Sequence, residues 1–353
     1  MSGVQLMIRN SLLGLMMLGI LTACGNESPT SEVAQEQPAQ GGPLLVYASH
    51  DASRTASALD AYRSETGTRF QLRSDDMAER DSRLANPLLM PKVDLFVGGS
   101  LAELWAVAEA DALRPVSSEL IAGNISDAMR DPESRWIALS SRARIVAYNT
   151  DLVSLDKIAS VRDYTSLGDE TWRDSLCLAS SAVPGNRALI AFLIKQLGVR
   201  DAEITVRRWR ENLAELVFAN DLELIDAVAS GQCAVGILDS NVFAAYARAR
   251  SDAPVAAYWF ESPDTILFDI SGAGVTRHAA DPDGAKALLE WLTTVTPNAL
   301  FAAQNFEFPA NSDSQTGAAI SAWSEFVMEP ASLSELAFLL EDADRLIERA
   351  RYP

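Results

Sequence analysis

The sequence predicts an α/β fold divided into two lobes, and three observations support this. From Leu44 onward, short apolar segments alternate with amphipathic helical patterns, which is typical of a largely parallel sheet covered by helices. The chain has 353 residues, and single cores stop growing beyond about 250 to 300 residues. With 48% hydrophobic and 22% charged residues, the composition is that of a globular protein.

The first lobe is expected to comprise residues 44–142 together with 270–300. Its strands are predicted at 44–49, 70–73, 93–98 and 270–276. The helix after the first strand runs to about Glu65 because Gly67 supplies a stop, and Ser100 can cap the helix after the third strand. Asp281 and Pro282 supply an N-cap and a first helical residue for a helix whose apolar face is expected to pack onto this lobe.

The second lobe is expected to comprise residues 143–269 together with 301–353. A strand at 142–149 leads out of the first lobe, and further strands are predicted at 176–181 and 233–238. Helices are predicted around Leu189, at 221–230 and at 332–350, where apolar residues recur at helical spacing.

The first 23 residues are predicted to be an export signal peptide. Arg9 precedes an apolar run at 11–23 that ends in small residues and is too short to span a bilayer. The sequence LTAC at 21–24 resembles the lipobox of bacterial lipoproteins, which implies cleavage before Cys24 and attachment of lipid to its sulfur. We therefore expect an exported protein on the periplasmic or cell-surface side that contacts the membrane only through this lipid.

Residues 24–43 are predicted to be the lipidated cysteine and a flexible tether. After Cys24 the segment is rich in Ser, Pro, Gln, Glu and Gly, so it cannot bury enough apolar surface to offset the entropy of ordering. Such a composition is typical of linkers between an anchor and a folded body.

Two cysteines remain for the folded body. Cys177 and Cys233 are an even pair in an oxidising compartment, and each lies in or begins a predicted strand, so we expect a disulfide between them. The alternative is two buried free thiols.

The net charge and the residue types in the chain exclude several classes of function. The net charge is −19, with 48 acidic and 29 basic residues, whereas nucleic-acid binding relies on clustered Lys and Arg. The two histidines are far apart in sequence, and we find no nucleophile elbow and no Cys/His cluster. We therefore expect neither an enzyme nor a protein with a resident cofactor.

Several blocks of the chain form a recognisable series, which begins at VYASHD (46–51) and continues at 131–149, 176–181 with the downstream Asn186, 227–241, 270–292 and 306–309 (FEFP). In order and spacing, these blocks resemble the ferric-iron-binding periplasmic proteins of ABC importers. The resemblance implies a two-lobed periplasmic-binding-protein fold of type II, with hinge strands between the lobes and a ligand cleft between them. It also implies an ABC permease as partner and a small-molecule or metal-chelate ligand, and we expect a monomer.

The family's iron ligands do not carry over to this chain. The resemblance implies two adjacent tyrosines after the strand matched by 233–238, but Asn241, Val242 and Phe243 stand there. The nearest phenol, Tyr246, lies about one helical turn further on, roughly 5 Å along the axis, where a structural role is the alternative. The family's other ligand positions fall on Asp51 or Ala52 (with His50 out of register), near Gly99, and on Pro184 or Gly185. We therefore predict no metal site from these positions.

Small polar residues at the predicted strand ends are the candidate ligand-binding residues. Exposed backbone N–H groups before helix starts suit an anion such as phosphate, carboxylate or metal-bound carbonate. The alternative for each residue is a helix cap or a turn. The set comprises Ser49, His50, Asp51, Gly98, Gly99, Ser100, Ser180, Ser181, Asn186, Arg187, Asp239, Ser240, Asn241 and, after the helical turn, Tyr246.

Two arginines of the strand at 142–149 are further candidates. Arg142 and Arg144 occupy alternate positions and so project to one face, where either could meet a ligand carboxylate. Ion pairing within so acidic a protein is the other interpretation.

These observations lead to three hypotheses. The first is a lipid-anchored solute-binding protein of an ABC importer whose ligand is an iron chelate or a small organic anion. The second is a cell-envelope sensory or interaction lipoprotein that retains the fold without transport. The third is direct ferric iron binding through Tyr246, Asp239 and His50.

Overall fold

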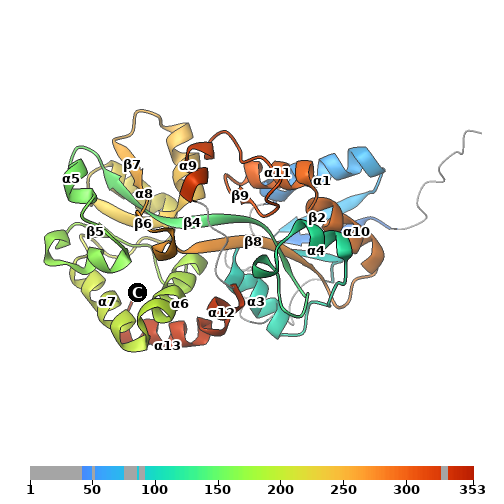
Figure 1. Cartoon of the computed structure of the whole chain (residues 1–353), viewed down its shortest axis with the longest axis horizontal. Helices are drawn as coiled ribbons and strands as arrows, with labels where there is room; N and C mark the ends of the chain where they lie inside the picture. Colours follow the sequence, from blue (N-terminus) through green and yellow to red (C-terminus); the bar gives the residue numbers. More distant parts are fainter. Residues whose placement is uncertain (1–41, 50–51, 75–85, 87–91, 327–332) are drawn as a thin grey trace, which may run out of the picture. The chain divides into compact units, whose positions relative to one another are not determined.

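The computed structural model describes residues 42–49, 52–74, 86, 92–326 and 333–353 (Figure 1). The predicted signal peptide, Cys24, most of the tether, His50 and Asp51 lie outside these residues. None of the helices within the described ranges has both the length and the apolar character needed to cross a membrane.

One sheet organises the described chain, with strands in the order β2-β1-β3-β8-β4-β6-β5, and with β7 and β9 also pairing with β4. Strand β1 is parallel to β2 and β3, and β5 is parallel to β6, but β4 and β8 run antiparallel to their neighbours. The sheet is therefore mixed rather than largely parallel. The strands are β1 Leu44–Ala48, β2 Phe70–Ser74, β3 Leu95–Gly98, β4 Ile137–Asn149, β5 Leu176–Cys177, β6 Val235–Asp239, β7 Val255–Tyr258, β8 Phe268–Val275 and β9 Phe308–Pro309.

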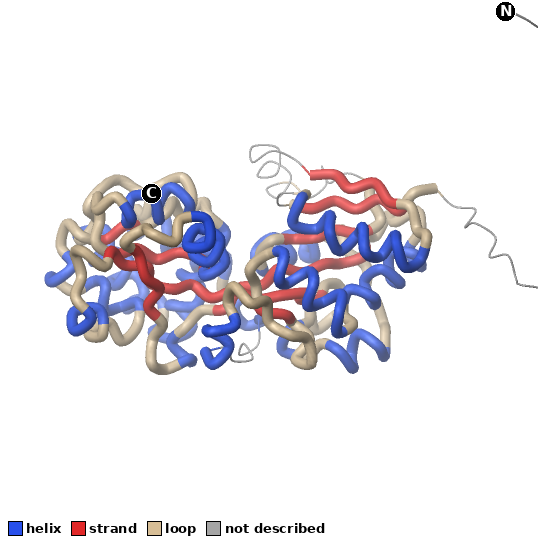
Figure 2. The backbone as a smooth tube through the Cα atoms, turned by 90° about the horizontal axis from the view of Figure 1, so that it is seen from above, coloured by secondary structure: helices blue, strands red, loops and turns tan. Residues whose placement is uncertain are grey.

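Strand β4 joins two groups of elements. Its first half pairs with β8 and β9, whereas its second half, from Arg144 onward, pairs with β6 and β7. In Figure 2 strands continue from one group of helices into the other. We expected this strand to begin at residue 142; it begins at Ile137 because Ser140 and Ser141, which weaken the apolar pattern, are buried against β8 and β9.

Helices cover both groups. Those of the first group are α1 Ser53–Thr66, α3 Leu101–Glu109, α4 Glu119–Asn124, η2 Asp127–Met129, α10 Pro282–Leu292 and α11 Val295–Gln304. Those of the second are α5 Leu155–Ile158, η3 Tyr164–Gly168, η4 Glu170–Trp172, α6 Pro184–Leu197, α7 Val199–Glu211, α8 Asp221–Ala229, α9 Ser240–Ala249 and η5 Pro263–Thr265. The remaining helices, η6 Ser321–Phe326, α12 Leu333–Phe338 and α13 Leu340–Ala350, follow near the end of the chain.

The predicted helix signals are confirmed. The Ser100 hydroxyl accepts a hydrogen bond from the N–H of Glu103 at the start of α3, and the Asp281 carboxylate accepts one from the N–H of Gly284 at the start of α10. Gly67 ends α1 with a φ of 72°, the left-handed conformation that glycine adopts without strain.

Two further predicted elements are wrong in extent. The strand expected at 176–181 pairs with β6 only through Leu176 and Cys177, because the chain then bends toward Phe218, with which Ala179 forms an isolated bridge. The single helix expected at 332–350 is divided at Leu339 into α12 and α13. The two helices pack on different neighbours, α12 on α3 and α6 and α13 on α6 and α7, which a straight helix could not satisfy.

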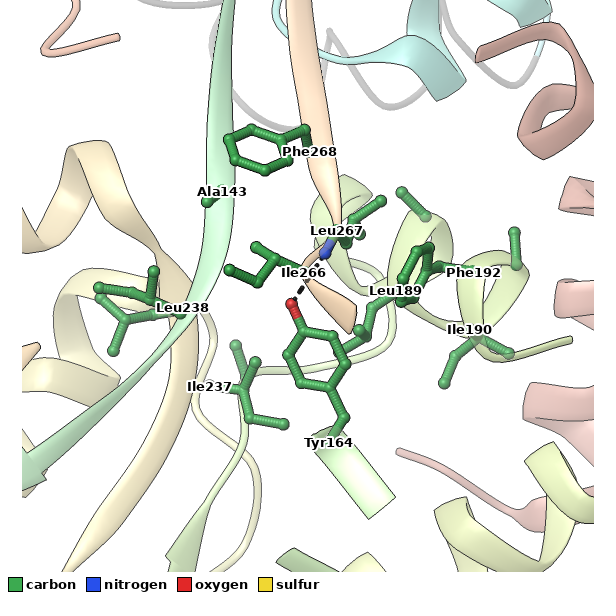
Figure 3. Close-up of a cluster of buried hydrophobic side chains, with 14 of the residues drawn as sticks. Ala143, Tyr164, Leu189, Ile190, Phe192, Ile237, Leu238, Ile266, Leu267 and Phe268 are labelled. Carbon is green, nitrogen blue, oxygen red and sulfur yellow. Dashed lines mark hydrogen bonds between the residues drawn. The ribbon is translucent and has the colours of Figure 1, made fainter. Parts of the chain in front are cut away.

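The core is made of two apolar clusters. The larger extends through both groups and contains the fully buried Trp136, Trp172 and Trp209, and the smaller lies around β1 and α10 in the first group. Figure 3 shows part of the larger cluster, where the Tyr164 hydroxyl accepts a hydrogen bond from the N–H of Leu267 at 3.1 Å. Residues Gln40–Pro353 form one compact unit to which both groups belong.

The predicted disulfide is confirmed. Cys177 of β5 is bonded to Cys233, which lies just before β6, with their Cα atoms 5.9 Å apart and a sequence separation of 56. The bond therefore ties β5 to the chain just before β6, the strand that leads into α9.

Candidate functional site

Arg142 is the centre of a buried polar cluster where β4 passes from one group to the other. Its Nε donates to the Asp239 carboxylate at 2.9 Å, and its terminal nitrogens donate to Asp269 at 3.0 Å and Glu307 at 3.3 Å. The same guanidinium reaches the backbone oxygen of Gly99, after β3, at 2.7 Å. Arg142 therefore connects the end of β6 with the end of β3, two places predicted to face a ligand.

Arg144 is completely buried on the same side of β4. It donates to Asp221 at 2.7 Å, to Asp239 at 3.1 Å and to the side-chain oxygen of Asn186 at 2.6 Å. Both arginines contact Asp239, as their alternate positions in the strand predict. In this structure both arginines are ion-paired within the protein, which is the second of the two interpretations drawn from the sequence.

The charges of this cluster do not balance. The carboxylates of Asp221, Asp239, Asp269 and Glu307 meet the two guanidiniums of Arg142 and Arg144, which gives a formal charge of −2. All six side chains are buried. Electrostatic interactions are stronger in such a setting than in water, so each unmatched carboxylate is costly to keep ionised.

Burial and the neighbouring arginines shift the pKa values of these carboxyl groups in different directions. Burial alone would raise the pKa of Asp239, but the nearby Arg144 and Arg142 guanidiniums outweigh it and hold that pKa below its usual range. Burial raises the pKa of Asp269 and that of Asp221, although Arg142 opposes the first shift and Arg144 opposes the second. Of these three acids, Asp239 therefore stays ionised most firmly, and Asp221 and Asp269 accept protons more readily.

Candidate residues of the first group are bonded to one another. The Ser49 hydroxyl donates to Glu103 at 2.6 Å, and the N–H of Gly99 donates to the same Glu103 oxygen at 2.7 Å. Ser100 caps α3, while the N–H of Leu101 donates to Asp269 at 2.9 Å. The structure thus gathers Ser49, Gly99 and Ser100 at the end of β3, where the cap interpretation of Ser100 also holds.

Candidate residues around the start of α6 separate into two sets. Asn186 faces Arg144, and its amide nitrogen also donates to the backbone oxygens of Ala179 and Ser180, both at 2.9 Å. Arg187 faces away to form a two-pronged ion pair with Asp344 of α13, with both N–O distances 2.7 Å. Asn186 therefore belongs to the polar cluster, and Arg187 is bonded outside it.

The backbone N–H groups of Ser180 and Ser181 already have partners. The N–H of Ser180 donates to Phe218 and that of Ser181 to Pro353, both at 2.7 Å. An anion bound by these amides would have to displace the end of the described chain. The structure thus gives this loop a role as a turn, the alternative stated for it above.

Residues at the start of α9 also differ in their surroundings. The Ser240 hydroxyl accepts a hydrogen bond from the N–H of Ala143 at 3.1 Å, and the Asn241 amide donates to Glu307 at 3.2 Å. Tyr246 lies further along α9, with the Arg250 guanidinium 4.5 Å from its ring centroid. Burial, followed by hydrogen bonding to Asp226, raises the pKa of Tyr246, so its phenol is not disposed to ionise.

Sequence reasoning missed three acids of the cluster. Asp221, Asp269 and Glu307 were not among the candidates, although Glu307 lies in the FEFP block and Asp269 directly precedes the predicted strand at 270–276. Each stands at or near an end of a buried element, where an acid is unexpected unless it has a partner. An acidic residue at the end of a buried element is the sequence signal that could have identified these three acids.

The described residues contain no group of three or more His, Cys, Asp or Glu side chains arranged to hold a metal ion. Of the three residues considered for direct iron binding, Asp239 is bonded to both arginines and Tyr246 contacts Arg250. His50 lies outside the described ranges. Nothing in the described part of the chain therefore assembles this set.

The chain is similar to known solute-binding and iron-uptake proteins. The model of the family described as bacterial extracellular solute-binding protein matches residues 57–328. Iron uptake protein A1 of Synechocystis sp. is 25% identical over 348 residues, which cover 94% of this chain and 92% of that protein. Iron uptake protein A2 of the same organism is 28% identical over 260 residues, which cover 69% of this chain and 72% of that protein.

Solved structures show the same fold. The Trichodesmium protein called IdiA or FutA, in complex with iron and citrate, superposes with a TM-score of 0.78 at 25% identity, covering 88% of this chain and all of that one. A ferric binding protein from Campylobacter jejuni superposes with a TM-score of 0.77 at 20% identity and the same coverage of this chain. The expected type II periplasmic-binding-protein fold is therefore confirmed.

Proposed function

The chain belongs to the bacterial extracellular solute-binding protein family, a family of exported, non-enzymatic transport components, and on that premise we propose that it delivers chelated ferric iron to an ABC permease. The proposal adds the nature of the ligand to the solute-binding role. It also retains the lipid anchor at Cys24, which is supported by the LTAC sequence at 21–24.

The proposal is supported chiefly by the contacts of Asp239, whose carboxylate accepts hydrogen bonds from the guanidiniums of Arg142 and Arg144. Asp239 ends β6, the strand after which the family resemblance implies paired tyrosines, and Asn241 and Val242 follow it instead. Ferric iron is a hard cation that prefers oxygen ligands. Because both carboxylate oxygens of Asp239 and one of Glu307 already accept hydrogen bonds, a chelator has to supply most of the oxygens around the metal.

The alternative ligand, a free organic anion, is favoured less by the cluster. Both guanidiniums that could bind an anion are already paired with carboxylates, and the amides of Ser180 and Ser181 that would attract one donate within the protein. A chelate offers a metal centre that the surplus carboxylates attract.

Unfolding of the full lipidated protein in detergent tests the proposal. Ferric citrate at a hundred times its dissociation constant should raise the free energy of unfolding by about 2.7 kcal/mol, whereas citrate alone and phosphate should not. Asn241→Ala should weaken the response because it removes a polar group beside Glu307, and Asn124→Ala, at the end of α4, should not.

Other outcomes would contradict the proposal in distinct ways. An equal response to citrate alone would indicate an organic-anion site. A visible tyrosinate band with ferric citrate would indicate direct coordination by the protein. No response to any ferric chelate would favour the sensory or interaction role.

A further inference from the structure

The short helix α12 touches elements of both groups. It contacts α6 of the second group and also α3 and η2 of the first. Figure 1 shows α12 between α6 and α3, beside α13. The helix lies after residue 328, beyond the segment matched by the family model.

On one side, α12 and the chain after it are fastened to the second group. Lys195 of α6 forms an ion pair with Glu335 at 2.7 Å. Beyond α12, the Tyr352 hydroxyl donates to the backbone oxygen of Ala179 at 2.7 Å. Together with the Arg187 ion pair to α13, these contacts fasten α12 and the chain after it to the second group.

On the other side, an aromatic contact joins α12 to the first group. The rings of Phe338 and Trp105 of α3 meet edge to face, with centroids 4.9 Å apart and an interplanar angle of 76°. The Arg135 guanidinium lies 5.9 Å from the centroid of the Trp105 ring. Phe338 is 68% exposed, so this contact lies at the surface and can separate without unfolding the core.

The remaining side chains of α12 extend the larger apolar cluster. Leu333, Leu336 and Ala337 are buried, and they belong to the same cluster as Leu104 of α3 and Leu189 of α6. Separation of α3 from α6 would expose part of this apolar surface, which costs about 25 cal/mol for each Å².

We propose that α12 is a strap that favours the closed arrangement of the two groups, and that Phe338 and Trp105 are positioning residues for ligand affinity. Binding proteins with hinge strands close around a ligand by moving one lobe against the other. A contact that spans the two groups stabilises the arrangement in which it forms, and so shifts that equilibrium without touching the ligand. The strap therefore raises affinity by reducing the share of protein that is open before binding. This inference rests on the proposed function only where ligand affinity is measured; the test without ligand does not depend on it.

The first test uses no ligand. Small-angle neutron scattering of the full protein in detergent-free nanodiscs, in solvent contrast-matched to the nanodisc, should give a larger radius of gyration for Phe338→Ala and for Trp105→Ala. The double variant should show no further increase, because either change removes the same contact. Phe338→Tyr keeps the ring and should restore the original value. Leu155→Ala is the matched control, since Leu155 is 74% exposed on α5 of the second group.

The second test measures ferric citrate binding in the same variants. An aromatic pair of this kind should change affinity by about two- to tenfold, with Phe338→Ala weaker and Phe338→Tyr unchanged. If ferric citrate does not bind the unchanged protein, the proposed ligand is wrong, but the scattering result still decides the strap. Identical scattering for Phe338→Ala, Trp105→Ala and Leu155→Ala would overturn the strap.

Discussion

Replacement of Arg142 by methionine should destabilise the protein strongly, and the loss should depend on pH. The change keeps most of the side-chain volume but removes the charge that faces Asp239, Asp269 and Glu307. Asp239 retains Arg144, whereas Asp269 and Glu307 lose the cation that pairs with them among the described residues. Breaking a buried ion pair by removing one partner costs about 3–5 kcal/mol.

The sign of the pH dependence follows from Asp269. Burial already raises its pKa above the unfolded value, with Arg142 opposing that shift, so the pKa rises further in Arg142→Met. Between the unfolded and the folded pKa, the folded variant then holds a proton that the unfolded chain has released. Its free energy of unfolding should therefore increase as the pH is lowered from 7 toward 5, and the deficit relative to the unchanged protein should shrink.

Chemical denaturation at pH 7 and pH 5 measures both effects. Arg142→Met/Asp269→Asn should recover part of the loss at pH 7 and show a weaker pH dependence. The control is Arg187→Met, which breaks a partly exposed pair with Asp344 and should cost no more than about 1 kcal/mol. A loss below 1 kcal/mol for Arg142→Met, or the same loss at both pH values, would refute the reasoning.

Three further predictions concern stability and can be measured by chemical denaturation. Reduction of the bond between Cys177 and Cys233 should lower the free energy of unfolding by roughly 4 kcal/mol on the chain-entropy model, and a Ser/Ser variant should then not respond to reductant. Tyr164→Phe should cost about 1–3 kcal/mol because the N–H of Leu267 loses its acceptor; a neutral result would contradict this. Gly272→Ala should lower the free energy of unfolding by about 1–3 kcal/mol or more, because its methyl group would collide with the backbone of β4. Unchanged stability would contradict this and show that the backbone of β4 can move away.

Local signals in the sequence predicted much of the fold. The caps by Ser100 and Asp281 and the stop at Gly67 depend on chemistry within a few residues, and all three are confirmed. The disulfide followed from the number of cysteines and their place in strands. These features were predictable because each is decided by the residues that form it.

Features set by distant parts of the chain were not predictable in the same way. Arg142 was a candidate because of its place in a strand, but its partners Asp269 and Glu307 come from segments more than 120 residues away. The turn after Cys177 depends on Phe218, and the division at Leu339 depends on which helices lie beneath. A pattern read along the chain contains no information on such neighbours.

The way the described cluster is bonded also limits how a ligand can bind. Arg142 holds the end of β3 through Gly99 and the end of β6 through Asp239, so it links both groups even without a ligand. A solute that enters between these ends has to compete with, or add to, contacts that are already made. A free anion competes for the guanidinium and leaves further carboxylates unpaired, whereas a metal chelate can draw a carboxylate such as Glu307 toward its cationic centre while Arg142 keeps Asp239 and Asp269. This reasoning underlies the proposal of a ligand that carries both its own oxygen donors and a cation, and it predicts different results for ferric citrate and citrate alone.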